Sequence, residues 1–265
     1  MTIFEIIVLA IIQGITEFLP ISSSAHLLLP AELLGWKAQG LSFDVAVHVG
    51  SLLAVILYFR KDIVDLFLGW TRSFTGTTSQ ESSLAWNIII ATIPAIIVGL
   101  AAKSFIDQYA RSVEVMATTT VAFGLLLWWA DHRAKQINGL QVMGWKQALI
   151  IGVAQIAALI PGTSRSGVTM TAGLMLGFDR ESAARFSFLL SIPTILGAGT
   201  LVTLDLLASD EAVVWLDLAL GAVLSFVSAY LCIVLFLKWI SRIGMLPFVI
   251  YRLALGAILF AIILL

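Results

Sequence analysis

Charged side chains are scarce in this sequence. Of its 265 residues, 15 are Lys or Arg and 16 are Asp or Glu, so 12% are charged, whereas 60% are hydrophobic. A soluble domain usually carries about twice that charged fraction. This excludes an ordinary water-soluble globule and predicts an integral membrane protein, because a bilayer accepts helices that are apolar on all sides.

The sequence also lacks an excess of basic charge, a second cysteine and a basic N-terminal stretch. The net charge is -1, so no excess of basic residues indicates nucleic-acid binding. The single cysteine, Cys232, excludes an intramolecular disulfide and a metal site built on several thiolates. The N-terminal residues lack the basic stretch of a cleavable signal peptide, and the first cation is Lys37. We therefore expect the first apolar segment to belong to the mature fold.

Long apolar runs are abundant instead. Six are long enough to cross the roughly 30 Å hydrocarbon layer of a bilayer. They lie at residues 43–59, 84–102, 113–130, 186–207, 216–237 and 247–265. The stretch 61–72 is typical of a helix that lies at the membrane interface. The sequence thus predicts an all-α membrane protein with six transmembrane helices.

The loops between these runs differ in charge. One set holds ten of the fifteen cations, and the opposite set holds three. The ten are Arg60, Lys61, Arg72, Arg133, Lys135, Lys146, Arg180, Arg185, Lys238 and Arg242, and the three are Lys37, Lys103 and Arg111. By the positive-inside rule, the richer set faces the cytoplasm. The opposite face also holds an acidic loop with Asp210 and Glu211, and the last two cations, Arg165 and Arg252, lie in apolar surroundings.

Two apolar stretches are interrupted before they can span a membrane. Residues 3–35 and 145–178 each contain an apolar segment, a proline with neighbouring hydroxyl residues, and a second short apolar segment. Lys146 and Arg180 flank the second stretch and are both assigned to the cytoplasm, so this stretch is predicted to be a re-entrant helical hairpin. We expect the same of 3–35, which places the N-terminus outside.

The order of one hairpin and three spans occurs twice. A unit with three crossings ends on the opposite face, so two such units in tandem are inverted relative to each other. The sequence therefore predicts a single membrane domain over 1–265, with repeats over about 1–130 and about 145–265. Residues 17–23 and 158–164 align weakly at an offset of 141.

Polar side chains collect at the tip of the first hairpin. Gln13 and Glu17 share one helix face, and an ionisable residue inside a membrane usually lines a polar cavity. The tip continues with Ser22, Ser23, Ser24 and His26. Together these residues form a candidate acid–base group. Most of them have a structural alternative: a serine could cap a helix at 25–34, Gln13 could bond a neighbouring helix, and Glu17 could pair with a buried arginine.

The tip of the second hairpin has the composition of a phosphate-binding loop. Residues 161–169 read Pro-Gly-Thr-Ser-Arg-Ser-Gly-Val-Thr. Glycines allow close backbone approach, hydroxyls and amides donate hydrogen bonds, and a helix beginning near 168 presents its positive end. Arg165 offers a planar fork that matches phosphate oxygens, or a partner for Glu17 until phosphate arrives. The other candidate phosphate-binding residues here are Gly162, Thr163, Ser164, Ser166, Gly167 and Thr169.

The two tips should meet near the middle of the bilayer, because they enter from opposite faces. We expect a cavity with a carboxylate, an imidazole, hydroxyls and a guanidinium, which suits a ligand with a phosphate head and a long apolar tail. His48 is expected near the outer interface. Arg252 could reach the interface, pair with lipid phosphate or face the cavity.

The two motifs resemble those of the bacterial undecaprenyl-diphosphatase family, which is linked to bacitracin resistance. The resemblance rests on Gln13-x-x-x-Glu17, on the following residues 18–26 and on 161–169, and it covers the whole chain. It implies hydrolysis of undecaprenyl diphosphate to undecaprenyl phosphate and inorganic phosphate, which recycles the lipid carrier for peptidoglycan synthesis. It also implies a multi-pass protein of the bacterial cytoplasmic membrane with a site open to the periplasmic face.

The resemblance further implies roles for single residues. The expected catalytic residues are Glu17, Ser23, His26 and Arg165. Diphosphate binding is expected from Ser22, Ser24 and the polar residues around Arg165, above all Ser164 and Thr169. A divalent cation, Mg²⁺ or Ca²⁺, is expected at Gln13 and Glu17. Some relatives have Glu at the position of Gln13, but an amide oxygen also binds a hard cation. The expected partners are the polyprenyl diphosphate lipid and the bilayer, and a homodimer is left open.

A transporter is the main alternative. Inverted repeats with broken helices that meet within the membrane are a transporter architecture, so the chain could move or flip a lipid phosphate or an anion. A transporter does not need an acid–base pair beside a row of hydroxyls, which favours an enzyme. A purely structural scaffold would leave Glu17 and Arg165 unexplained.

Overall fold

The computed structural model describes residues 1–36, 40–208 and 214–264. Outside these ranges lie some residues used in the sequence analysis, namely Lys37, Asp210, Glu211 and residue 265. The described chain folds into α1 (Ile3–Phe18), α2 (Ser23–Leu34), α3 (Leu41–Tyr58), α4 (Arg60–Ser73), α5 (Gln80–Tyr109), α6 (Val113–Arg133), the 3₁₀ turn η1 (Leu140–Val142), α7 (Trp145–Gln155), the 3₁₀ turn η2 (Ile156–Leu159), α8 (Arg165–Met175), α9 (Arg180–Leu207), α10 (Trp215–Ile243) and α11 (Leu246–Leu264).

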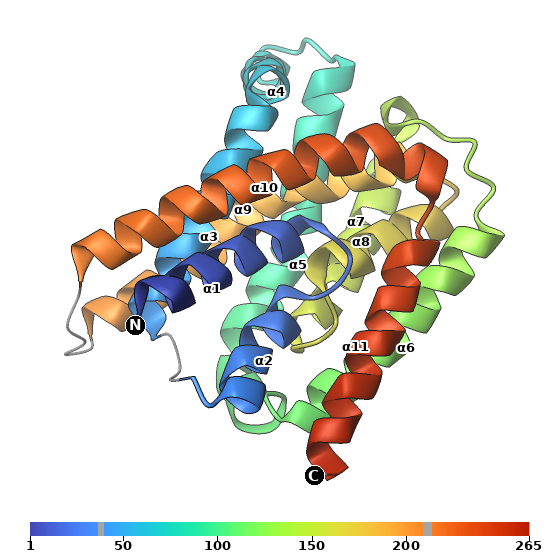
Figure 1. Cartoon of the computed structure of the whole chain (residues 1–265). Helices are drawn as coiled ribbons and strands as arrows, with labels where there is room; N and C mark the ends of the chain where they lie inside the picture. The colour runs from blue at the N-terminus through green and yellow to red at the C-terminus, as the bar shows by residue number, and fades with distance from the viewer. Residues whose placement is uncertain (37–39, 209–213, 265) are drawn as a thin grey trace.

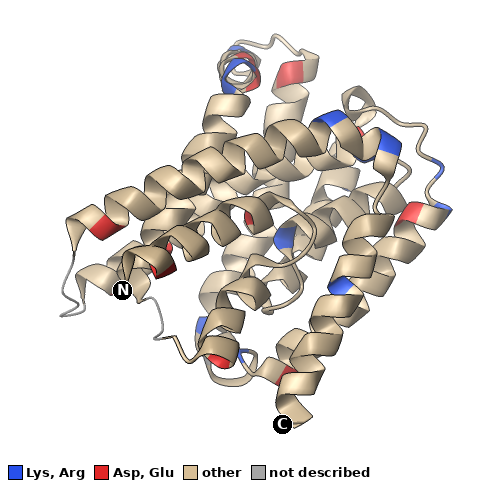
Figure 2. Cartoon of the chain, in the orientation of Figure 1, with Lys and Arg blue, Asp and Glu red and all other residues tan. Residues whose placement is uncertain are grey.

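Within the described residues, six helices are long and apolar enough to cross a membrane, and they coincide with the six predicted spans. These are α3, α5, α6, α9, α10 and α11, so the prediction of an all-α multi-pass membrane protein is confirmed. Helix α4 falls where the interfacial helix was predicted. In Figure 1, α10 runs along α1 and α3, and α11 lies beside α6. Figure 2 shows most charged residues near helix ends and connections, with a few inside the bundle.

Ion pairs join loops that the charge analysis assigned to the same face. Arg180 at the start of α9 donates to Asp131 near the end of α6, with 2.6 Å between Nε and Oδ1. At the other end of the bundle, Lys103 of α5 pairs with Asp205 of α9 at 2.6 Å. The grouping of the loops therefore agrees with the packing of the helices.

The two interrupted stretches form the helical hairpins α1–α2 and α7–α8. Helices α1 and α7 begin 142 residues apart, at Ile3 and Trp145, and α2 and α8 begin the same distance apart. This register pairs Ser22 with Ser164, whereas the sequence alignment paired Ser23 with Ser164. The difference arises at the tips, because Ser164 follows Pro161 by three residues whereas Ser22 follows Pro20 by two. The first arms offset it, since α1 has 16 residues whereas α7 has 11 and continues as the four residues of η2. A 3₁₀ turn rises more per residue, so both arms are about 24 Å long.

Both ends of the α7–α8 hairpin lie beside one connection of the chain. The backbone N–H groups of Ile137 and Asn138 donate to the carbonyl oxygen of Gly177 at 3.2 Å, just after α8. Trp145, where α7 begins, follows the same connection. The chain thus leaves this hairpin where it entered, as a re-entrant hairpin requires. The inverted arrangement of two repeats in a bilayer stays a prediction.

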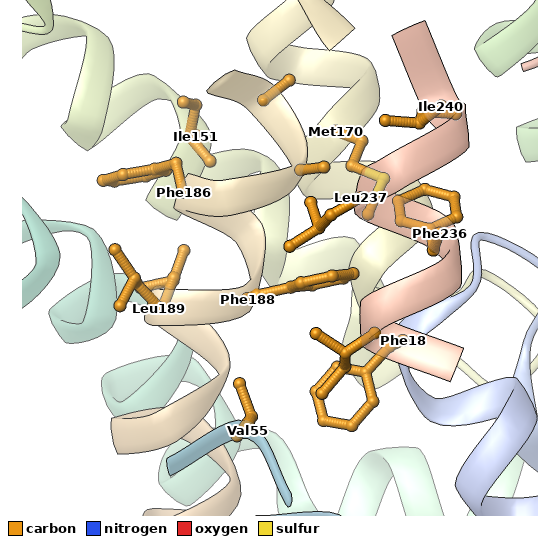
Figure 3. Packing of buried hydrophobic residues seen from close by; sticks show 14 of the residues in the cluster. Phe18, Val55, Ile151, Met170, Phe186, Phe188, Leu189, Phe236, Leu237 and Ile240 are labelled. Atoms are coloured by element: carbon orange, nitrogen blue, oxygen red, sulfur yellow. The ribbon is translucent and has the colours of Figure 1, made fainter. Parts of the chain in front are cut away.

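Aromatic packing fixes the end of α1. Phe18 is fully buried and meets Phe188 of α9 edge to face, with 5.2 Å between ring centroids. Phe188 in turn packs on Phe236 of α10, with 5.7 Å between ring centroids. Figure 3 shows these rings in the buried cluster. Because Phe18 directly follows Glu17, this packing holds the last turn of α1 and with it the Glu17 carboxylate.

Candidate active site

Both hairpins turn at a serine with left-handed backbone. Ser22 has a φ of 73° and precedes α2, and Ser164 has a φ of 70° and precedes α8. Non-glycine residues adopt this conformation rarely and at an energetic cost. The Ser164 hydroxyl accepts from the backbone N–H of Gly167 at 3.1 Å, whereas the Ser22 hydroxyl lies 3.1 Å from that of Ser24 and caps no amide. Helix α8 starts earlier than predicted, so Arg165 is its first residue.

The two tips contact each other directly. The backbone N–H of Gly162 donates to the Ser24 hydroxyl at 3.2 Å, and the Ser166 hydroxyl donates to the carbonyl of Leu19 at 2.8 Å. The N-terminal ends of α2 and α8 therefore lie together, as the sequence predicted for the two tips. Two helix N-termini side by side favour a negative charge between them.

The carboxylate of Glu17 lies at the centre of this junction. Its Oε1 accepts from Arg165 Nη2 at 3.3 Å, and its Oε2 accepts from Gln13 Nε2 at 2.9 Å and Ser23 Oγ at 3.3 Å. The side chains of Glu17 and Arg165 are only 8% and 12% exposed. The ion pair considered as the alternative to phosphate binding is thus present, and it is shielded from water.

His48 of α3 belongs to this group, although the sequence analysis placed it near the outer interface and left it out. Its Nε2 lies 3.8 Å from Glu17 Oε2, and its Nδ1 lies 2.8 Å from the carbonyl oxygen of Asp44. A carbonyl oxygen only accepts, so Nδ1 carries a proton and Nε2 is left to face the carboxylate. A histidine on an apolar helix was the available signal, and it was used for His26 alone.

His26 has both ring nitrogens bonded elsewhere. Nδ1 lies 2.6 Å from the carbonyl oxygen of Ser22, and Nε2 lies 2.6 Å from the hydroxyl of Tyr251 in α11. Because Nδ1 donates to a carbonyl, the neutral ring accepts from Tyr251 through Nε2. The buried His26 therefore joins the start of α2 to α11. Tyr251 was not predicted as part of the site.

Arg252 of α11 connects the two tips. It is fully buried, and its guanidinium donates to five backbone carbonyls. These carbonyls belong to Pro20 of the first tip, Gly162 and Thr163 of the second, and Thr119 and Thr120 of α6. Of the three alternatives left open for Arg252, an interfacial position and a lipid contact are excluded by this burial. The Arg252 side chain faces the junction of the two tips and binds the backbone of both.

Other polar groups of the second tip are engaged within the protein. The Thr169 hydroxyl donates to the Ser187 hydroxyl at 2.7 Å, and Gly167 and Ser166 make the bonds described above. Thr163 is fully buried, and its hydroxyl oxygen has no partner among the described residues. The residues predicted to bind phosphate thus surround Arg165 closely, and most of them shape the tip in this structure.

Gln13 fits part of a cation site. Its Oε1 is buried and has no hydrogen-bond partner among the described residues, whereas its Nε2 donates to Glu17. An unpaired buried acceptor is unfavourable, and Mg²⁺ and Ca²⁺ prefer oxygens of this kind. In the described part of the chain, no group of three or more His, Cys, Asp or Glu could enclose a metal ion. The residues therefore fit a cation shared with ligand phosphates, as Mg²⁺ commonly is.

These features define a multi-pass helical membrane protein with an ion-paired polar site where two broken helices meet. The chain matches the family described as "Bacitracin resistance protein BacA" over residues 6–258, and it belongs to that family. It is 66% identical over 260 residues, 98% of each chain, to the "Undecaprenyl-diphosphatase" of Alteromonas mediterranea. It is 61% identical over 257 residues, 97% of each chain, to the "Undecaprenyl-diphosphatase 1" of Pseudoalteromonas translucida.

Proposed function

We propose that this protein hydrolyses undecaprenyl diphosphate to undecaprenyl phosphate and inorganic phosphate. Two relatives that match nearly the whole chain are named for this activity. The structural observation that carries the proposal is the position of Glu17, which contacts the Ser23 hydroxyl on its own hairpin and the Arg165 guanidinium on the other. At that point a carboxylate that can act as a base, a hydroxyl that can act as a nucleophile and a guanidinium that can bind phosphate lie together.

The diphosphate binds where the N-termini of α2 and α8 meet. Arg165 contacts the Glu17 carboxylate through Nη2 alone, and Nη1 donates to the Ser187 carbonyl. When the guanidinium turns to the phosphate oxygens, its planar fork gives the ligand two parallel charge-assisted hydrogen bonds. This exchange also frees the carboxylate to act as a base. Phosphoryl transfer depends mainly on positioning and on charge stabilisation, and this junction supplies both.

Ser23 is the nucleophile in this proposal. Its Oγ bonds to the terminal phosphorus while its proton passes to Glu17, and the bond from that phosphorus to the bridging oxygen breaks. Undecaprenyl phosphate leaves with the bridging oxygen. A water molecule then attacks the phosphoserine, and the bond from phosphorus to Ser23 Oγ breaks. Glu17 returns its proton to Ser23 Oγ, and inorganic phosphate leaves with both hydrogens of the water. His48 exchanges protons with Glu17 through Nε2, whereas His26 supports the backbone of Ser22.

Gln13 and Glu17 would hold a divalent cation, Mg²⁺ or Ca²⁺, together with the diphosphate oxygens. When bound, the cation supplies positive charge that offsets repulsion between the carboxylate and the diphosphate. The chain's own part is the placement of one amide oxygen and one carboxylate on the same face of α1.

We place the protein in the bacterial cytoplasmic membrane, with the cation-rich loops inside and the site open toward the outer face. The charge asymmetry of the loops supports the orientation of the loops. The outward opening of the site follows from the family resemblance alone. With the site on the outer side, the products are released outside the cytoplasm, and the monophosphate lipid becomes available for another round of wall-polymer synthesis.

Phosphate release by purified protein in detergent tests this function, because detergent provides no second compartment for transport. With undecaprenyl diphosphate and Mg²⁺ or Ca²⁺, we expect phosphate release that Glu17→Gln lowers by about 100-fold or more. Glu181→Gln, at an exposed position in the first turn of α9, is the control and should keep normal activity. Absence of release by the unmodified protein with either cation would reject the phosphatase and favour the transporter.

A further inference from the structure

A groove between α3 and α9 begins beside the Glu17 carboxylate. Its volume is about 290 Å³, and its α3 wall is one helix face that includes Val45, His48 and Val49. His48 lines the groove and also lies 3.8 Å from Glu17. The groove is therefore continuous with the candidate active site through this histidine.

The surface of the groove suits a hydrocarbon chain. On the α9 wall, the hydroxyls of Thr200 and Thr203 donate to the carbonyl oxygens four residues earlier, each at 2.7 Å. Their hydrogen-bonding needs are thus met within the helix. Val49 and Leu196 are 42% and 50% exposed, so the groove is open along its length to the surroundings of the bundle. Those surroundings are lipid tails if α3 and α9 span the membrane.

We propose that this groove holds the first isoprene units of the polyprenyl chain while the diphosphate lies at Glu17 and Arg165. The inference rests on the proposed function, because it takes the position of the phosphate head from it. A lipid substrate must pass its chain from a polar site into the bilayer, and a groove that is polar at one end and apolar beyond it meets that need. His48 marks the boundary between the two parts.

A second apolar groove, of about 370 Å³, lies between α1, α10 and α11 and fits this role less well. It is lined on this side by Ile15 of α1 and by Leu19, which directly follows that helix. Ile15 is two residues from Glu17, so the two side chains point to opposite sides of α1. The Glu17 side chain faces Gln13 and His48 instead. A chain in this second groove would be separated from the carboxylate by the helix itself.

Gly199 offers a way to fill the α3–α9 groove without disturbing the fold. It lines the groove, and a Cβ atom at this position would meet no atom within 4 Å. Gly199→Leu should raise the KM for farnesyl diphosphate by about tenfold or more, because a lost methylene-sized space in an apolar pocket has effects of that order. The Ki of methyl diphosphate as a competitive inhibitor should stay unchanged, because this molecule has no chain to displace.

Ala198→Leu is the matched control, because Ala198 is exposed on the same helix and lies outside the groove lining. It should leave both constants unchanged. An unaltered KM in Gly199→Leu, or an equal rise in the KM of the prenyl substrate and the Ki of methyl diphosphate, would overturn the proposal.

Photolabelling separates this inference from the proposed function. A farnesyl diphosphate analogue with a diazirine in its first isoprene unit should label peptides of α3 and α9, and Gly199→Leu should reduce that label. Labelling of α1 and α10 by a protein that still releases phosphate would reject the groove and keep the phosphatase. Labelling of α3 and α9 by a protein that releases none would keep the groove as a prenyl-chain site and reject the phosphatase.

Discussion

The two hairpin tips share a backbone plan and differ in chemistry. Helices α2 and α8 each begin directly after a left-handed serine, Ser22 or Ser164, yet the first helical residue is Ser23 in one and Arg165 in the other. Equivalent positions thus place a hydroxyl and a guanidinium on the same carboxylate, that of Glu17. The shared backbone provides two adjoining helix N-termini. The side chains differ, so the first tip carries the proposed reacting hydroxyl of Ser23 and the second carries the guanidinium of Arg165.

The largest effect is expected from a change of the Arg165 guanidinium in the second tip. Arg165→Lys keeps the charge but loses the planar fork, so kcat should fall by about 100-fold to 1,000-fold, the range seen when one transition-state donor is removed. The measurement is phosphate release from undecaprenyl diphosphate. Arg185→Lys changes another arginine that pairs with a carboxylate, Asp62, and should stay near normal. Near-normal turnover of Arg165→Lys would show that the second tip does not need its fork.

The hydroxyl of the first tip comes next. Ser23→Ala should lower kcat by about 100-fold and abolish a phosphoenzyme that is trapped by rapid acid quench of the unmodified protein with labelled substrate. Ser83→Ala removes an exposed hydroxyl of α5, away from the tips, and should keep the phosphoenzyme. Substantial activity in Ser23→Ala would instead indicate direct attack by water, with the first tip supplying only the base.

A smaller effect separates the two histidines of the site. His48→Gln should lower kcat by about tenfold or more, because His48 Nε2 faces the Glu17 carboxylate and a glutamine cannot exchange the proton. His26 bonds the Ser22 carbonyl and the Tyr251 hydroxyl and does not contact Glu17. His26→Gln can keep the first bond, and because the contacts of His26 are structural, this variant should lower thermal stability more than kcat. Comparing kcat and melting temperature for both variants tests the assignment, and the reverse ranking of kcat would return the proton-transfer role to His26.

The smallest effect is expected from a change in the proposed site for the divalent cation. Gln13→Ala removes one ligand and leaves Glu17, so the Mg²⁺ concentration for half-maximal activity should rise by several-fold, with little change in kcat at saturating Mg²⁺. Gln13→Glu should lower that concentration. A titration with Mg²⁺ after treatment with EDTA measures both, and an unchanged midpoint in both variants would exclude Gln13 as a ligand.

The fold could be predicted well from the sequence because the bilayer constrains it strongly. Chain length and apolarity define the six spans, and prolines within apolar stretches mark the two hairpins. Glu17 and Arg165 could also be found, because a charge inside an apolar segment needs a partner or a ligand. The structure shows these two residues in contact.

The rest of the site depends on packing between distant segments. His48 lies on a helix whose apolar faces look alike in sequence, so periodicity does not tell which face meets α1. The partners of Arg252 are backbone carbonyls, which leave no trace in the side-chain pattern. The pairing of Ser22 with Ser164 was missed by one residue, because the alignment matched Pro20 with Pro161 and the second tip has one more residue between its proline and its left-handed serine.

The carbonyl bonds of Arg252 have a mechanical consequence. One guanidinium holds Pro20 of the first hairpin and Gly162 and Thr163 of the second. If one hairpin moved relative to the other, the buried Arg252 guanidinium would lose some of its carbonyl partners. Water could not replace them at this buried position, so the movement would cost several kcal/mol. The two hairpins are therefore coupled through Arg252. This coupling opposes an alternating-access cycle and favours a stationary site that substrate and products enter and leave by the same side.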